Sequence, residues 1–392
     1  MSKDTTNTKA LQPKQPLLHI VRRADLAWWK SWFFRIGAFV ISCIVCLIII
    51  NSVTGAGASD VWKALVKSFI GSSTSVGEAI KTIQFWAVIR ETLLLLGIAL
   101  ALVPAFKMRF WNIGARGQFF AGALTTAIVM KFLTPYMSTG MLFVTMIVGS
   151  VLAGALWGVI PAIFKAKWNT NETLFTLMMN YIMVQIVAYC SIIWAAREGA
   201  PGMGVINKLG SEFYMKGWFA TDIMSGVFSD KNDMIMVFIV VALAAFMWVY
   251  MNRTKRGYEI SVVGESENTA RYAGINVKSV IIRTMLLSGA ICGLIGFMMV
   301  SGYAHTVSVD TEGMRGFTAI IVTWLGKFKV GYMALVSLLL SLLSAGTSQL
   351  ATSIGLKETL ADVLVGIVLF FIIGSEFFVN YKIKFRRKEG TK

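Results

Sequence analysis

The sequence predicts an all-α polytopic membrane protein with about ten transmembrane helices, including broken helices arranged as an inverted repeat. Of its 392 residues, 56% are hydrophobic and only 15% are charged, whereas an average soluble domain is about 25% charged. Ten apolar runs are long enough, or nearly so, to cross a hydrocarbon core of about 30 Å. None alternates with the period of two that a lipid-facing β-barrel requires. These observations exclude an ordinary soluble enzyme, a disordered chain and a nucleic-acid-binding domain, despite a net charge of +17.

Three segments are expected along the chain. Residues 1–32 form a cytoplasmic segment, in which residues 17–36 are typical of an amphipathic helix at the membrane surface, because tryptophans accompany basic side chains. Residues 33–381 form the transmembrane domain, and residues 382–392 form a basic cytoplasmic tail. The expected spans are 33–54, 85–105, 118–134, 141–164, 172–195, 234–252, 281–303, 317–330, 331–350 and 360–381. The third and the eighth of these are short and interrupted.

The basic residues predict the orientation. With both termini in the cytoplasm, 26 of the 37 Lys and Arg residues fall on the cytoplasmic side. Such an excess is the usual signature of cytoplasmic loops. Glu172 and Glu376 lie at the edges of spans, where we expect Glu172 to neutralise Lys165 or Lys167 and Glu376 to pair with the basic tail.

The sequence carries no pattern for an enzyme or a metal site. Cys43 and Cys46 lie inside an apolar run, Cys190 and Cys292 stand alone, and the chain has only two His. A zinc or redox site needs a second ligand pair in polar surroundings. No phosphate-binding loop or paired-acid arrangement occurs either. We therefore expect no catalytic residues, metal or cofactor, and any ATP hydrolysis must take place on another chain.

Two irregular stretches interrupt the apolar runs. Residues 110–122 (FWNIGARGQFFAG) follow the second span, and residues 303–316 (YAHTVSVDTEGMRG) follow the seventh. Non-helical backbone at membrane depth is tolerated only where protein buries it or where it lines an aqueous cavity. Such breaks in corresponding places of two oppositely oriented halves are typical of transporters. Ordinary loops between helices remain the alternative.

The longest cytoplasmic loop, residues 252–280, is expected to contain a short helix. Glu near the start of a helix and Gly just beyond its end are the usual signals. A compact cytoplasmic helix is a docking element, although a solvated basic loop is also compatible with this sequence. The residues that would form the docking element are Gly264, Glu265, Asn268, Ala270, Arg271, Ala273 and Gly274.

Five motifs, in order, resemble the ATP-binding-cassette permeases of the simple-sugar and nucleoside uptake group, a bacterial inner-membrane family of the branched-chain amino acid and ribose type. Residues 110–118 are similar to the family's F-N-I-G-A-E-G-Q, and residues 171–181 to its N-E-V-x-x-T-x-M-L-N-Y. Residues 263–275 are similar to its cytoplasmic A-V-G-x-N-x-x-A-A-x-Y-A-G-I signature. Residues 288–296 and the pairs 316–317 and 325–326 continue the match, so the resemblance covers roughly residues 80–380.

The resemblance implies a permease subunit that forms half of the path for a neutral small solute, most of all nucleosides, in a bacterial cell membrane. The implied partners are a cytoplasmic ATPase, a second related permease (more often a heterodimer than a homodimer), an extracytoplasmic substrate-binding lipoprotein and membrane lipids, with no nucleic acid. The short helix around 264–274 would then couple the permease to the ATPase. Simple sugars, riboflavin or another polar solute are alternatives within the same class.

The residues expected along the path are mostly uncharged and polar. Thr176 and Asn180 are four apart and share one helical face. Hydrogen bonding between helices is the alternative role for each of these residues. The full set is Asn112, Gln118, Glu172, Thr176, Asn180 and Trp324.

Four positions depart from the family pattern. Arg116 replaces the usual Glu, and since an intramembrane Arg needs a partner, we expect it to face Glu172 or lipid phosphate. Thr323 and Trp324 replace small residues, so that Trp324 either stacks on a base or narrows the pore. Val330 stands where Pro is usual.

A different class of function must also be weighed. An ion-coupled secondary transporter would use broken helices too, but it should bury carboxylates near the midplane of the membrane. Only Glu172 and Glu376 come close, and both lie near the ends of spans.

Overall fold

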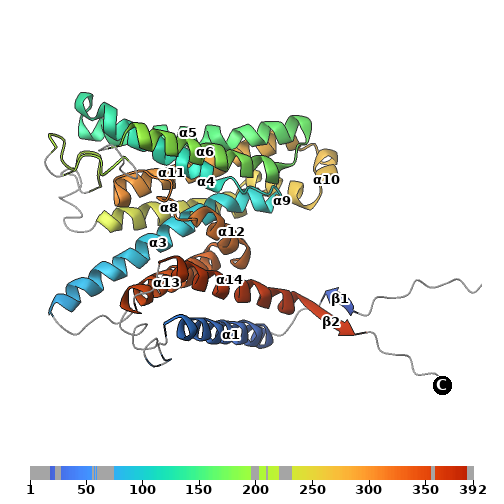
Figure 1. Ribbon diagram of the computed structural model, residues 1–392. Helices are drawn as coiled ribbons and strands as arrows, with labels where there is room; N and C mark the ends of the chain where they lie inside the picture. Colours follow the sequence, from blue (N-terminus) through green and yellow to red (C-terminus); the bar gives the residue numbers. More distant parts are fainter. Residues whose placement is uncertain are drawn as a thin grey trace, which may run out of the picture. The chain divides into compact units, whose positions relative to one another are not determined.

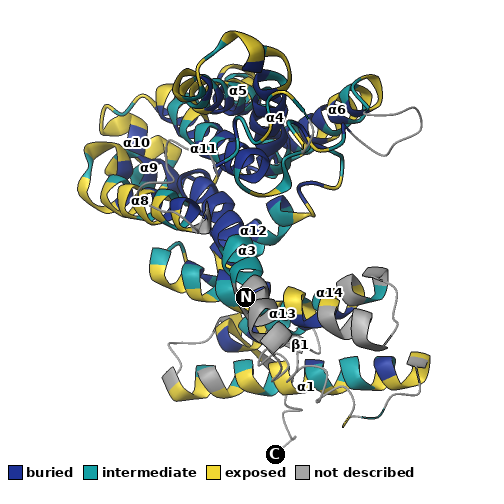
Figure 2. Cartoon of the chain, turned by 90° about the vertical axis from the view of Figure 1, so that its left-hand side faces the viewer, coloured by how far each residue is buried: buried dark blue, intermediate teal, exposed yellow. Residues whose placement is uncertain are grey.

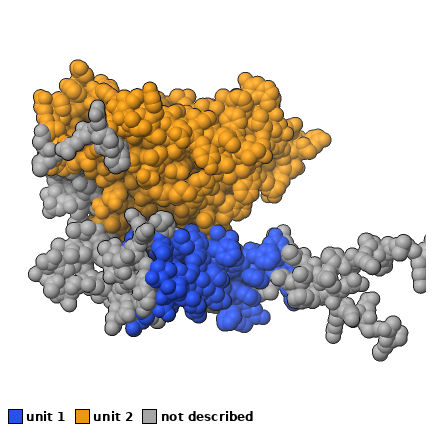
Figure 3. All heavy atoms as spheres, viewed as in Figure 1, with its two compact units in different colours: residues 1–71, 344–392 blue, residues 72–343 orange. Residues whose placement is uncertain are grey.

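The computed structural model describes residues 18–22, 28–54, 57, 59, 75–195, 203–208, 211–219, 232–354 and 358–385. The chain divides into two compact units, residues 1–71 with 344–392 and residues 72–343 (Figure 3). The elements of both units are almost entirely helical, which confirms the predicted all-α membrane fold.

The smaller unit joins the two ends of the chain. Helix α1 (Trp28–Thr54) packs along α14 (Glu358–Asn380), and strand β1 (Leu18–Arg22) pairs antiparallel with β2 (Tyr381–Phe385) (Figure 1). The expected surface helix over 17–36 is therefore wrong at its start, where backbone pairing with the distant β2 gives a strand. Residues 1–17, 23–27 and 386–392 of the predicted cytoplasmic segments lie outside the described residues.

One ion pair in this unit gives Glu376 a partner that the sequence analysis did not name. The Arg35 Nε atom lies 2.9 Å from Glu376 Oε1, so Glu376 pairs with α1, whereas residues 386–392 of the basic tail lie outside the described residues. The pairing follows from the packing of α1 on α14, because Ile50 and Leu364 are both buried at the contact between these helices.

The larger unit is built around α11 (Val277–Met299), which packs against α3 (Ser75–Lys107), α4 (Ala115–Ile128) and α5 (Thr139–Trp168). Figure 2 shows α4 and α11 largely buried. A Cβ atom built on Gly154 would lie 2.3 Å from the Gly289 carbonyl oxygen, and one on Gly122 the same distance from the Gly293 oxygen. Glycines allow these backbones to approach as closely as helix packing in membranes requires.

The remaining elements of this unit complete the spans. A π-helical turn, η1 (Val129–Leu133), and a 3-10 turn, η2 (Thr134–Tyr136), extend α4. Between α5 and α11 the chain forms α6 (Glu172–Ile193), α8 (Asn232–Arg253), α9 (Lys255–Glu265) and α10 (Glu267–Tyr272). After α11 come the π-helical turn η3 (Val300–Ala304), α12 (Arg315–Leu325) and α13 (Val330–Ile354), and the boundary between the two units falls within α13.

Nine helices among the described residues are long and apolar enough to cross a membrane. The predicted eighth span, 317–330, is instead the 11-residue helix α12. At 1.5 Å per residue α12 is about 16 Å long, roughly half of a hydrocarbon core. The third span, by contrast, is complete, because η1 and η2 carry the helix to Tyr136.

Candidate functional site

The first break in the helices is residues 108–114, between α3 and α4. Asn180 of α6 fixes it with two bonds of 2.8 Å: its side-chain oxygen accepts from the Gly117 N–H, and its amide donates to the Ile113 carbonyl. The Thr176 hydroxyl accepts from the Ile113 N–H at 3.2 Å. Buried backbone groups need such partners, because an unpaired one is costly in an apolar interior.

Asn112 holds the middle of this break. Its side-chain oxygen accepts from the Gly114 N–H at 3.0 Å, and its amide donates to the Ser288 hydroxyl of α11 at 3.1 Å. Gln118 bonds the same side chain at 3.3 Å. The four predicted path residues Asn112, Gln118, Thr176 and Asn180 are at most 3% exposed. In this conformation they therefore make the hydrogen bonds between helices that were the alternative prediction.

The other two predicted path residues lie nearer the ends of helices. Glu172 forms an ion pair with Lys165 at 2.9 Å, which confirms one of its two expected partners. Trp324, at the end of α12, stacks on Trp111 of the first break with ring centroids 5.4 Å apart. Its side chain remains 44% exposed.

The second break is residues 305–314, between η3 and α12. Glu312 is fully buried, its carboxylate accepts from the Gly316 N–H, and it forms an ion pair with Arg116 Nε at 3.2 Å. Arg315 pairs with Glu91 of α3 through two bonds of 2.7 Å. The prediction that Arg116 faces Glu172 or lipid phosphate is wrong, because the second break brings the buried carboxylate of Glu312 to it.

Sequence reasoning missed Glu91, Glu312 and Arg315. One signal was available: Glu312 and Arg315 are oppositely charged and three residues apart within a stretch already identified as irregular. Charges at membrane depth are rare and usually paired, so they could have been expected to find partners. Which partners they find depends on the packing of α3, α4 and α12.

The described residues between α6 and α8, 203–208 and 211–219, contact the start of the second break at His305. His305 has φ +51° and stacks on Trp218 with centroids 3.8 Å apart, and its carbonyl accepts from the Ile206 N–H. Burial lowers the pKa of His305 to about 4, while a hydrogen bond with the Val300 backbone opposes this shift. His305 is therefore neutral in the folded protein near pH 7.

The short helix predicted within residues 252–280 is present as α10. The Ser266 hydroxyl caps it by accepting from the Thr269 N–H at 3.3 Å, and Gly274 follows it with φ +75°, a conformation that favours glycine. Ala270 is buried, whereas Tyr272 is 94% exposed. Of the residues predicted for this element, Asn268, Ala270 and Arg271 lie in α10, and Ala273 and Gly274 follow it.

A second helix, α9, was not expected in this loop and contains Gly264 and Glu265. The Thr254 hydroxyl caps it by accepting from the Gly257 N–H. A Cβ atom on Gly264 would lie 2.0 Å from the Lys107 carbonyl oxygen, so α9 packs directly on the end of α3. The first break begins at that same end.

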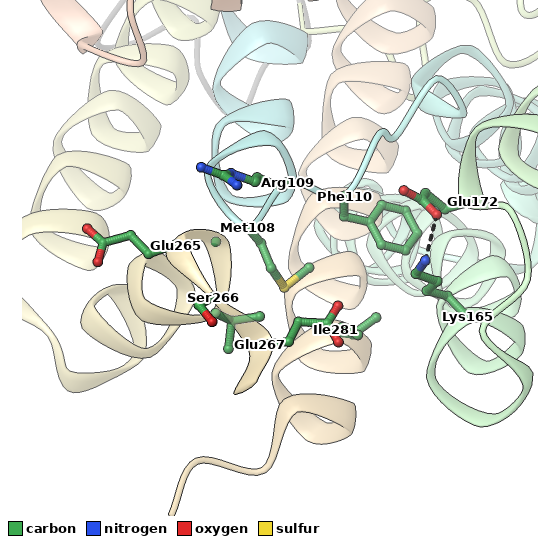
Figure 4. A pocket seen from close by; sticks show the side chains of 11 residues that line it. Met108, Arg109, Phe110, Lys165, Glu172, Glu265, Ser266, Glu267 and Ile281 are labelled. Carbon is green, nitrogen blue, oxygen red and sulfur yellow. Dashed lines mark ion pairs between the residues drawn. The ribbon is translucent and has the colours of Figure 1, made fainter. Parts of the chain in front are cut away.

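A cavity of about 160 Å³ lies beside this contact (Figure 4). In Figure 4, Met108 and Phe110 of the first break lie between the turn from α9 to α10 and the Lys165–Glu172 ion pair. Its lining residues are Met108, Arg109, Phe110, Lys165, Glu172, Val263, Gly264, Glu265, Ser266, Glu267 and Ile281. The arrangement places the first break next to α9 and next to the turn into α10, the helix that was predicted to dock a partner.

Comparisons with known proteins place most of the chain in one family. The family described as "Branched-chain amino acid transport system / permease component" matches residues 82–373. A guanosine permease of Bacillus subtilis, NupP, is 29% identical over 88% of this chain and 93% of its own. A nucleoside permease of Lactococcus lactis, NupB, is 28% identical over 81% and 84%. A glucose permease of Haloferax volcanii is 28% identical over 74% and 76%.

Proposed function

Because the chain belongs to the family of branched-chain amino acid transport system permease components, we propose that it is the permease subunit of an ATP-binding-cassette importer and carries nucleosides. The observation that supports this most directly is the family match across both breaks and both cytoplasmic helices. Two of the relatives described above are nucleoside or guanosine permeases. The glucose permease makes a simple sugar the second candidate.

A neutral solute fits the electrostatics of the larger unit. Glu91, Glu172, Glu259 and Glu312 each form an ion pair with an Arg or Lys. A path next to paired charges presents hydrogen-bonding groups without a strong net field, which suits an uncharged polar solute. Asn112, Gln118, Thr176 and Asn180 would form the supporting wall of this path, with Glu172 at its cytoplasmic edge and the exposed side chain of Trp324 as a stacking surface.

The proposed assembly needs partners of three kinds. An ATPase would contact α9 and α10 in the cytoplasm, a substrate-binding lipoprotein would deliver the solute from outside, and a second, related permease would complete the path. The positive-inside bias supports cytoplasmic termini. The direct packing of Gly264 on Lys107 would transmit movement of α9 and α10 to the first break.

The test is reconstitution of the permease with its ATPase, partner permease and binding protein in vesicles. We expect ATP-dependent uptake of labelled guanosine, insensitive to ionophores, with glucose as the comparison solute. Tyr272→Ala, which removes a 94% exposed side chain of α10, should abolish solute-stimulated ATP hydrolysis. Tyr181→Ala, a 60% exposed tyrosine on α6, is the matched control and should retain it. Uptake driven by an ion gradient without ATP would show a secondary transporter instead.

A further inference from the structure

The starts of α4 and α12 meet at close range inside the larger unit. A Cβ atom built on Gly316 would lie 3.0 Å from the Arg116 nitrogen and 3.2 Å from its Cα. The two helix N-termini therefore touch through their backbones. Each helix N-terminus carries about half a positive charge, and Arg116 adds a full one. Without a negative charge between them, the two helix N-termini and the Arg116 side chain would repel one another.

Glu312 supplies the counter-charge. Its carboxylate is fully buried, accepts from the Gly316 N–H of α12 and forms the 3.2 Å ion pair with Arg116 of α4. It contacts both helix starts through its side chain alone. The Glu312 backbone is held as well, because its carbonyl accepts from Arg315 at 2.7 Å.

The two members of the pair are not equivalent. The Arg116 side chain is 21% exposed, donates to the Val309 carbonyl at 3.3 Å and lies 5.7 Å from the ring of Phe120. Glu312 without Arg116 would still accept from Gly316 and still face two positive helix ends. If the carboxylate of Glu312 were removed, the Arg116 guanidinium and the two positive helix N-termini would remain close together without a negative charge. Loss of the acid should therefore cost more than loss of the base.

We propose that Arg116 and Glu312 are a positioning pair that links the two breaks, so that α4 and α12 shift as one body during transport, with Glu312 as the dominant member. The proposal rests on the proposed function for its role in transport, but not for the contact itself. The first break lies next to α9 and α10. Through the Arg116–Glu312 contact, a movement of the first break would reach the second break, which lies more than 180 residues further along the chain. Such coupling requires a physical link whose removal changes both ends.

The first test uses Glu312→Gln, Arg116→Gln and the double variant in the reconstituted importer. We expect Glu312→Gln to lower the solute transported per ATP about tenfold and Arg116→Gln about threefold, with basal ATP hydrolysis retained. The double variant should resemble Glu312→Gln alone, since the two residues act through one contact. Glu312→Asp keeps the negative charge and should recover most of the loss. If the loss of solute transported per ATP in the double variant equalled the product of the two single losses, the two residues would act independently and the proposed pair would be overturned.

The matched control is Glu91→Gln. It removes another carboxylate that pairs with an Arg, but Arg315 keeps its bonds to the Thr311 and Glu312 carbonyls. We expect transport per ATP to change by no more than about twofold. An effect as large as that of Glu312→Gln would mean that any charge in this region matters, and would contradict the specific role of Glu312.

The second test needs neither solute nor ATPase. Thr318 lies in the first turn of α12, is half-buried, and donates from its hydroxyl to the Met314 carbonyl at 3.3 Å. In a chain whose four native cysteines are replaced, Thr318→Cys should react faster with a water-soluble maleimide when Glu312→Gln is also present. If labelling changes in this way but the wild-type importer takes up no nucleoside, the proposed function fails and the pair stands. Equal labelling rates in the two backgrounds would overturn the pair.

Discussion

The two breaks in the larger unit solve the same physical problem in different ways. In both, the helical hydrogen bonds stop inside a membrane protein, and the free backbone groups need partners. The first break, 108–114, is held by neutral amides and hydroxyls from α4, α6 and α11. The second, 305–314, is held by charges, with a buried carboxylate between an Arg and a helix start.

This difference has a consequence for how each break responds to change. Neutral hydrogen bonds are short-ranged and directional, so the first break depends on the exact shape of a few side chains. The second depends on a balance of charges that act over longer distances in a medium of low dielectric constant. The first should therefore be more sensitive to a lost polar atom, and the second to packing and protonation.

The largest effect is expected at the first break. Asn180→Leu removes the acceptor of the Gly117 N–H and the donor to the Ile113 carbonyl. Two buried backbone groups would lose their partners at about 1–3 kcal/mol each, so we expect the free energy of unfolding to fall by about 2–6 kcal/mol. Thermal unfolding of the purified chain in detergent measures this. The neighbouring exposed Tyr181→Leu is the control, and equal melting of the two variants would refute the role of Asn180.

A smaller effect is expected where the two breaks touch. Gly316→Ala places a Cβ atom 3.0 Å from both the Arg116 nitrogen and a Glu312 side-chain oxygen. Forcing these atoms apart should lower the free energy of unfolding by about 1–2 kcal/mol. Gly331→Ala, where a Cβ atom meets nothing within 4 Å, should be neutral or slightly stabilising. A Gly316→Ala protein as stable as Gly331→Ala would show that the two helix starts are not tightly packed.

The smallest effect is expected from pH, and only at the second break. The folded pKa of His305 is about 4, below its ordinary value near 6.5. The unfolded chain therefore binds the additional proton first, and stability should fall as the pH decreases from about 6.5 towards 4. His305→Asn, which tolerates the same positive φ, should reduce this slope when thermal unfolding is followed between pH 7.5 and 5. An unchanged slope would assign the pH dependence to other groups.

Local patterns predicted a good part of the fold and some of the site. The apolar runs predicted the nine spans found among the described residues, and the irregular stretches 110–122 and 303–316 identified both breaks. The signals around Ser266 and Gly274 predicted α10, because capping depends on neighbouring residues. The half-length of α12 was missed, because the predicted run was carried through residues 326–330 (GKFKV), although the glycine and two lysines interrupt the apolar pattern there.

The candidate site was predicted less completely. Asn112, Gln118, Thr176 and Asn180 were predicted to line the path, which stays a prediction, and the structure brings all four together in hydrogen bonds around the first break. Their contacts could not be foreseen, because an amide can face either a path or a buried backbone. Glu312 was not singled out, since its partner Arg116 is distant in sequence.

The sequence alone determined the class of this protein: a helical, multi-pass membrane chain of a known permease family. Composition, periodicity and short motifs act along the chain, and they suffice for such conclusions. Only the tertiary structure decided the partners, with Arg116 beside Glu312 and Glu376 beside Arg35. The physical reason is that a buried charge pairs with whichever opposite charge the helix packing brings within reach. That packing depends on close backbone contacts such as Gly154 on Gly289, which join residues far apart in the chain.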